Sequence, residues 1–178
     1  MRLLKRVRAV RASFDDAFRS AALVFPGLER IGVPLQIFVC TGYARDGAPL
    51  LIPELRGDDP TQLATLNWEE LREHAERGVV IGSHGVSHAH LTQLSDDELR
   101  HELTDSKGRI EDELGRECPD FAYPYGEHDL RVRNAVRAAG YERAYGLREH
   151  GRDQYALPRL DLYRRHGPLK GLLRLISW

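Results

Sequence analysis

The sequence has little of what marks a secreted, membrane-spanning or nucleic-acid-binding chain. It contains only 2 cysteines, too few for a disulfide framework. Its net charge is -1, from 26 basic and 27 acidic residues, which argues against nucleic acid as the main partner. No apolar run reaches the ~20 residues of a membrane span, and the basic N-terminus is not followed by the ~7–15 apolar residues of a secretory signal. We therefore expect a cytoplasmic protein, unless the chain has been trimmed, and the oligomeric state stays open.

The 178 residues are enough for one domain, which we expect to span 1–178. Short apolar runs alternate with helical patterns, as is typical of an α/β chain with a parallel sheet. A barrel of eight βα units usually needs ~250 residues, so the length favours a shrunken or incomplete barrel. The predicted strands are 7–14, 35–39, 79–81, 121–123, 141–147 and 155–163; the predicted helices are 17–30 with a break at Pro26-Gly27, 68–77, a helix from a capping box at Ser95 to about Leu114, 130–139 and 168–178.

Two pairs of polar residues follow predicted strands. Asp15 and Asp16 end the first strand, and His84 and His88 come after the third, four residues apart. Three of these side chains suit zinc or a neighbouring transition metal, and a site with three protein ligands keeps a position open for water. The remaining carboxylate lies where a base for that water is needed. The spacing of four predicts that one helical turn places both imidazoles on one side.

Each pair is weak evidence alone. Most Asp-Asp dipeptides are solvated turns, and two histidines four apart arise by chance in a chain with 8 histidines. A third element, Tyr123-Pro124-Tyr125-Gly126, predicts a tight turn after a strand. Such a turn is either an ordinary strand ending or a means of aiming a backbone N–H at an oxyanion.

The three elements in this order resemble the polysaccharide deacetylase family, also called the NodB-homology or carbohydrate esterase 4 family. Residues 13–17 (SFDDA) are similar to its TFDDG motif, residues 82–88 (GSHGVSH) to its histidine motif, and residues 121–126 (FAYPYG) to the FAYP(F/Y)G form of its third motif. The resemblance runs from about Val10 to Asp161. It implies a distorted (β/α) barrel of about seven strands, here an incomplete one. It also implies removal of acetyl groups, mostly from N-acetylated sugars, with Zn²⁺ or a similar ion.

The resemblance also implies roles for single residues. Asp15 is the expected general base, and the Tyr125 backbone N–H is expected to stabilise the oxyanion. The turn formed by Tyr123, Pro124 and Tyr125 is expected to contact the substrate. One divalent ion, Zn²⁺ with Co²⁺, Ni²⁺ or Mn²⁺ as alternatives, is expected to be held by Asp16, His84 and His88.

Several positions depart from the family pattern. Gly85 replaces a Ser or Thr whose hydroxyl could brace the histidine loop, and Ala17 replaces a Gly. Ala122 lies where many members carry an Arg that pairs with the base, and we predict that Arg159 replaces it. The late Leu-x-His motif that usually supplies the general acid is not found after the third motif; candidates for that role are His128, His150 and His166.

Other interpretations remain open. The chain could hydrolyse another non-peptide C–N bond, in a small amide or imide, or the substrate could be an ester. It could also be a sugar-binding relative that kept the metal site but lost efficient catalysis. For the leading reading we expect a carbohydrate or sugar-precursor substrate. We expect the loop 42–67, with Tyr43, Arg45 and Arg56, to line the mouth of the site. His90 is expected at its rim, and His74 and His101 on the surface.

Overall fold

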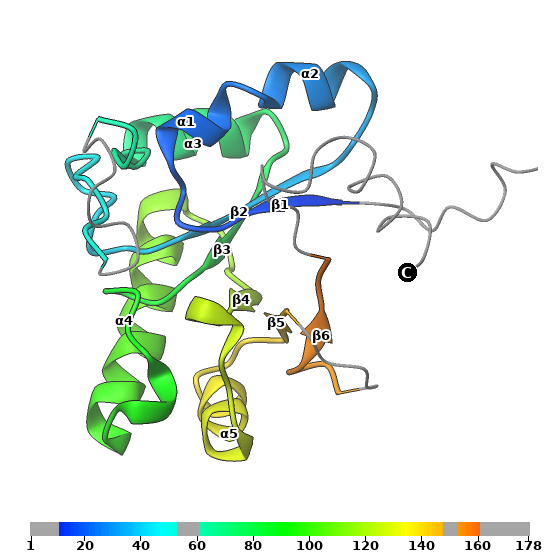
Figure 1. The fold of residues 1–178 in the computed structure, drawn as a ribbon. Coiled ribbons are helices and arrows are strands. Elements are labelled where there is room, and N and C mark those ends of the chain that lie inside the picture. Colours follow the sequence, from blue (N-terminus) through cyan, green and yellow to red (C-terminus); the bar gives the residue numbers. More distant parts are fainter. Residues whose placement is uncertain (1–10, 53–60, 148–152, 161–178) are drawn as a thin grey trace, which may run out of the picture.

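The computed structural model describes residues 11–52, 61–147 and 153–160. These residues form one six-stranded sheet in which all neighbours are parallel and the strand order follows the chain order (Figure 1). The predicted α/β class with a parallel sheet is confirmed. The strands are β1 (Ala12–Phe14), β2 (Leu35–Val39), β3 (Val80–Ser83), β4 (Asp120–Ala122), β5 (Arg143–Gly146) and β6 (Leu157–Pro158).

The helices fall between the strands, as the alternating pattern predicts. α4 begins at the predicted capping box, where the Ser95 hydroxyl accepts from the Glu98 N–H, and Asn67 caps α3 in the same way. The predicted helix 17–30 is two helices, because Pro26 has no N–H to donate and fits only the first turn of the second one. The helices are α1 (Arg19–Ala22), α2 (Phe25–Arg30), α3 (Trp68–Glu76), α4 (Asp96–Leu114) and α5 (Leu130–Ala138), with 3₁₀ turns η3 (Leu91–Gln93) and η4 (Pro124–Gly126).

The sheet is curled, and its two edge strands are linked at one end. Figure 1 shows β1 in blue and β6 in orange at the two edges. Arg159, directly after β6, donates hydrogen bonds to Asp15, directly after β1, and to the Ser13 hydroxyl. Within the described ranges a side-chain bridge rather than strand pairing therefore joins the edges, which confirms the incomplete barrel. Parts of the predicted strands 7–14 and 155–163, and the whole predicted helix 168–178, lie outside the described residues.

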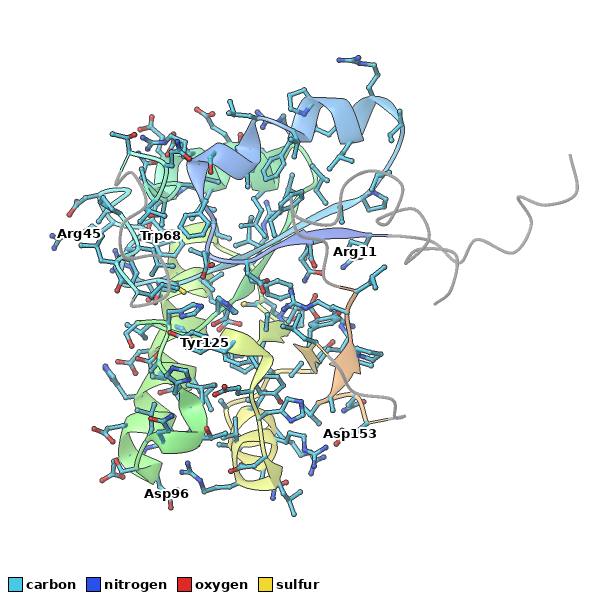
Figure 2. All side chains as sticks on the ribbon, viewed as in Figure 1. Arg11, Arg45, Trp68, Asp96, Tyr125 and Asp153 are labelled. Carbon is cyan, nitrogen blue, oxygen red and sulfur yellow. The ribbon has the colours of Figure 1, made fainter. Side chains whose placement is uncertain are left out.

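The two faces of the sheet have different contents. Ile37 and Val39 of β2 face the hydrophobic core beneath the helices, while Gln36 and Phe38 point to the inside of the curl. Gly82 makes room for Phe38, because a Cβ at this position would lie 2.7 Å from the Phe38 ring. Figure 2 shows the side chains filling the space between helices and sheet. No helix in the described part of the chain is long and apolar enough to span a membrane.

Candidate metal centre and active site

The candidate site lies at the carboxyl ends of the strands. Asp15 directly follows β1, His84 directly follows β3, and Arg159 directly follows β6. Because all strands are parallel, their carboxyl ends lie at the same end of the curled sheet. The active sites of barrel enzymes lie at this end.

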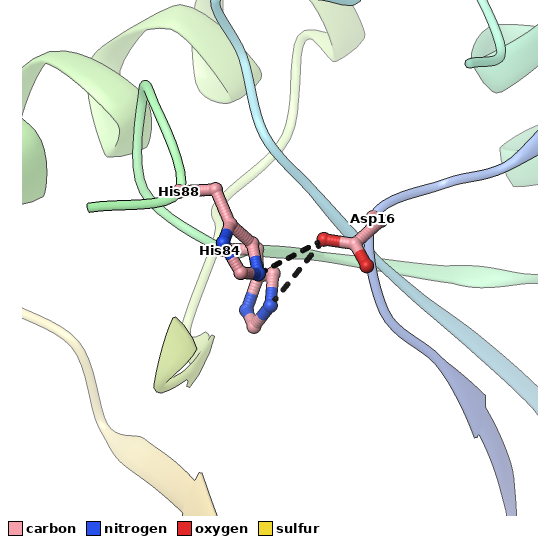
Figure 3. A group of neighbouring side chains, drawn as sticks. All are labelled: Asp16, His84 and His88. Carbon is pink, nitrogen blue, oxygen red and sulfur yellow. Dashed lines mark ion pairs between the residues drawn. The ribbon is translucent and has the colours of Figure 1, made fainter. Parts of the chain in front are cut away.

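Asp16, His84 and His88 converge on one point (Figure 3). Their ligand atoms all lie within 4.8 Å of one another. Asp16 Oδ1 is 3.3 Å from His88 Nε2 and 3.7 Å from His84 Nε2. The side chains come from the ends of two strands 68 positions apart in sequence number, 16 against 84, so the curl of the sheet creates the cluster.

The orientation of His84 suits metal binding. Its Nδ1 lies 2.8 Å from the carbonyl oxygen of Ala122, and a carbonyl can only accept, so Nδ1 carries the hydrogen. The lone pair of Nε2 therefore faces Asp16. Metal-binding histidines are commonly oriented by such a bond from the other ring nitrogen. The donor set and this orientation fit a divalent ion of the zinc type.

The histidines do not share a helical turn, so that part of the prediction is wrong. Residues 84–88 form a loop in which Gly85 and His88 have positive φ values of 82° and 63°. The loop is tied to the segment after β2, because Thr41 N–H donates to the Gly85 carbonyl and Gly42 N–H to the Val86 carbonyl. The centres of the two imidazole rings are still only 5.0 Å apart, and the ring planes make an angle of 67°.

Asp15 is held by Arg159 in a bidentate ion pair. The Arg159 guanidinium donates to both Asp15 oxygens, at 2.6 and 2.8 Å, and lies 5.1 Å from the Phe38 ring centre. Burial raises the pKa of Asp15, but the charges of Arg159 and the histidines outweigh it and hold this pKa below its usual 3.8. Asp15 Oδ2 lies 4.0 Å from His84 Nε2, so an ionised carboxylate stands beside the candidate metal point.

Burial disfavours charge at the ligands themselves. It raises the pKa of Asp16 to about 6; the negative charge of Asp15 adds to this effect, and His84 opposes it. Burial and the neighbouring His84 lower the pKa of His88 to about 4. A cation held between these groups would offset the cost of burying the Asp16 charge.

The Tyr125 turn borders the cluster on one side. Tyr125 has φ 60° and ψ 0°, a left-handed conformation that is uncommon outside glycine. Its ring lies 4.5 Å from the His88 ring and stacks on His90 at 3.8 Å and 7°. His90 Nδ1 is 3.0 Å from a Glu127 oxygen. His90 thus supports the Tyr125 turn, a contact that the sequence interpretation missed because stacking leaves no local pattern.

Tyr123 and Pro124 lie in the core rather than at the site surface. Tyr123 is fully buried, and its hydroxyl donates to the Tyr155 carbonyl at 2.7 Å. Pro124 is buried as well. The prediction that these two residues contact the substrate stays a prediction; their side chains are enclosed by protein, and Tyr125 is partly exposed.

The remaining predicted residues fall in several places. His128 packs on Tyr123, with ring centres 4.4 Å apart, whereas His150, His166 and Arg56 lie outside the described residues. His74 is buried against Phe25, so its expected surface position is wrong, while His101 is exposed as predicted. Arg45 points outward and pairs with Asp46 (Figure 2).

Comparisons with known proteins agree with this geometry. The family model for polysaccharide deacetylase matches residues 5–144. The chain belongs to the polysaccharide deacetylase family. The Bacillus subtilis (strain 168) protein YxkH, whose name assigns it to polysaccharide deacetylases, is 26% identical over 158 residues, which are 86% of this chain and 51% of YxkH. The chain thus spans about half the length of this relative.

Solved structures of the family share the fold. The Streptococcus pyogenes deacetylase PplD in complex with acetate aligns with a TM-score of 0.76 and 21% identity, over 93% of this chain and 70% of PplD. A de-N-acetylase from Aggregatibacter actinomycetemcomitans aligns with a TM-score of 0.73 and 17% identity, over 93% and 74% of the two chains. At these identities the comparison establishes the incomplete barrel and not the substrate.

Proposed function

We propose that the chain is a hydrolase that uses one divalent metal ion to remove an acetyl group from a carbohydrate. The single observation that carries the proposal is the convergence of Asp16, His84 and His88 beside an Asp15 carboxylate clamped by Arg159. Family membership supports the same reading.

In this proposal Asp16, His84 and His88 hold the ion, with Zn²⁺ as the first choice. When bound, such an ion supplies Lewis acidity toward the acyl carbonyl and lowers the pKa of water. Asp15 stays ionised at neutral pH because of Arg159, so it can take the proton of the attacking water. The Tyr125 backbone N–H would donate to the developing oxyanion.

The proton balance can be closed by Asp15 itself. Hydrolysis of an N-acetyl group consumes one water and gives acetate and an amine, and the departing nitrogen needs one proton. Asp15 acquires one proton when water attacks, and the low pKa of its carboxyl favours giving that proton up. We therefore assign both transfers to Asp15, since no late Leu-x-His motif, the family's usual source of the acid, follows residues 121–126.

The Asp15–Arg159 pair bears on the alternatives. A sugar-binding relative without catalysis has no need for a base fixed through both carboxylate oxygens, so this contact favours the enzyme. Hydrolysis of another amide or imide at the same centre is the second candidate. The ion would polarise the acyl carbonyl, a group that amides and imides share with acetylated sugars.

The test is an acetate-release screen over N-acetylated and O-acetylated sugars and sugar precursors, with small amides and imides in parallel. We expect release from an acetylated sugar that disappears in Asp16→Ala. Asp46→Ala serves as control, because Asp46 is an exposed carboxylate paired only with Arg45 among the described residues. Turnover of amides or imides alone would select the second candidate, and absence of any turnover by metal-loaded protein would refute both.

A further inference from the structure

A buried carboxylate on α4 holds the loop that carries both histidines. Glu102 is only 7% exposed although its side chain is polar. Its Oε2 accepts hydrogen bonds from the N–H groups of Val86 at 2.7 Å and Ser87 at 3.1 Å. Its Oε1 accepts from the Ser87 hydroxyl at 2.5 Å. Three donors, all lying between His84 and His88, thus converge on one side chain.

The loop is shaped around this carboxylate. A Cβ at Gly85 would lie 2.8 Å from Glu102 Oε2, and Gly85 has φ +82°. A side chain at position 85 would therefore collide with Glu102 unless one of them moved. The hydroxyl that the family motif places after the first histidine is absent, and the Ser87 hydroxyl, held by Glu102, does the bracing two positions later.

The carbonyl groups of the histidine loop, residues 84–88, are bound as well as its amides. The carbonyls of Gly85 and Val86 accept from Thr41 and Gly42, while the amides of Val86 and Ser87 donate to Glu102. The loop is therefore fixed between the β2 end and α4. His88, with its left-handed φ of 63°, directly follows the two residues that Glu102 binds.

We propose that Glu102 is a positioning residue for the metal centre, which fixes His88 and His84 in ligating geometry through the backbone of residues 85–87. The proposal rests on the proposed function only in that it assumes the ion at Asp16, His84 and His88. Outer partners of metal ligands typically change metal affinity 10–100-fold when removed.

The test measures binding of Zn²⁺ by competition with a chromophoric chelator, together with the visible absorption of bound Co²⁺. Glu102→Leu replaces the carboxylate by an apolar side chain and leaves the Val86 and Ser87 donors unpaired. We expect about 10–100-fold weaker Zn²⁺ binding and an altered Co²⁺ spectrum. Ser87→Ala, a milder variant in case Glu102→Leu does not fold, should weaken binding about fivefold.

Two controls separate positioning from general stability. Glu102→Gln can still accept from both amides while its NH₂ donates to the Ser87 hydroxyl, so it should bind Zn²⁺ within about threefold of wild type. Ile110→Ala truncates another buried side chain two turns further along α4, and it should lower the melting temperature without changing the Zn²⁺ affinity.

Equal Zn²⁺ affinity in wild type, Glu102→Leu and Ser87→Ala would overturn the proposal while leaving the proposed function intact. A loss in Glu102→Gln or in Ile110→Ala as large as in Glu102→Leu would also overturn it, since hydrogen-bond positioning would then not be the cause. A wild type that binds no Zn²⁺ would instead reject the metal centre itself.

Discussion

Two aspartate–arginine pairs lie at opposite ends of the same sheet, and they differ in what surrounds them. Asp120, at the start of β4, is 1% exposed and accepts from Arg143, Gln36 and Tyr145. Asp15, after the end of β1, has a side chain that is 31% exposed. Among the described arginines, only Arg159 pairs with it. The first carboxylate is enclosed by donors, whereas the second keeps an open side toward His84.

An aspartate paired with an arginine can therefore have a structural or a catalytic role, and its surroundings decide which. Asp120 accepts hydrogen bonds from three donors on β2 and β5, so its carboxyl group holds these strands together inside the curl. Asp15 has access to solvent and stands 4.0 Å from a candidate metal ligand, which is what a base for water requires. Substitutions at one end at a time test whether the two carboxylates have these different roles.

The largest effect is expected from Asp15→Asn. The amide cannot accept a proton, so acetate release should fall about 10²–10⁴-fold. Zn²⁺ binding should change little, because Asp15 is not among the three converging ligands. Kinetics with metal-loaded protein and a parallel Zn²⁺ titration check both statements. Loss of metal together with activity would show that Asp15 is a ligand instead.

Substituting Arg159 and Arg143 one at a time should give different effects at the two ends of the sheet. In Arg159→Met the burial of Asp15 is no longer offset, so the pKa of Asp15 rises and the acidic limb of the kcat/KM profile moves to higher pH. In Arg143→Met the buried Asp120 loses its counter-charge, and stability should fall by about 3 kcal/mol with the acidic limb unmoved. Denaturant unfolding and pH–rate profiles of both variants are the measurements. An unmoved limb in Arg159→Met refutes its role.

Metal affinity should depend on pH through Asp16. The pKa of its carboxyl is about 6 without metal, so protons compete with the ion below that pH, and His88, with a pKa of about 4, is neutral throughout. The apparent Kd for Zn²⁺ should therefore weaken about fivefold from pH 6 to pH 5 and change little above pH 7. A Kd that stays constant between pH 5 and 7 contradicts the assignment of Asp16 as a buried ligand.

The smallest effect concerns Gly85. Gly85→Ala puts a Cβ on a residue with φ +82° and against Glu102, so stability should fall by about 1–2 kcal/mol. Gly108→Ala is the matched control: it lies in α4 with nothing within 4 Å of the added Cβ and should raise stability by roughly 0.5–1 kcal/mol. Equal changes in thermal unfolding would show that the loop does not require glycine.

Residues that follow strands could be placed from the sequence. Asp15, Asp16 and His84 come at or just after the ends of predicted strands, and parallel strands bring such positions to the same end of the sheet. The contact between Arg159 and Asp15, 144 positions apart, followed from the missing arginine at Ala122 and is present in the structure. The capping boxes of α3 and α4 are local, and the one at Ser95 was predicted for that reason.

Other features depend on tertiary contacts that leave no local pattern. Two histidines four residues apart fit a helix as well as a loop. The segment forms a loop because Glu102 and the end of β2 hold its backbone. Tyr123 is buried in part because its hydroxyl bonds to the Tyr155 carbonyl, 32 positions later in the chain. His74 is buried because Phe25 packs on it, which the polarity of a histidine does not reveal.

Removal and return of the metal test the proposed centre most directly. Purified protein should contain about one equivalent of zinc or a neighbouring divalent metal by elemental analysis, with less than a tenth of that in Asp16→Ala. Chelation should abolish acetate release, and one equivalent of Zn²⁺ should restore it. Full acetate release by metal-free protein, or equal metal content in Asp16→Ala, would contradict the central claim that Asp16, His84 and His88 form a catalytic metal centre.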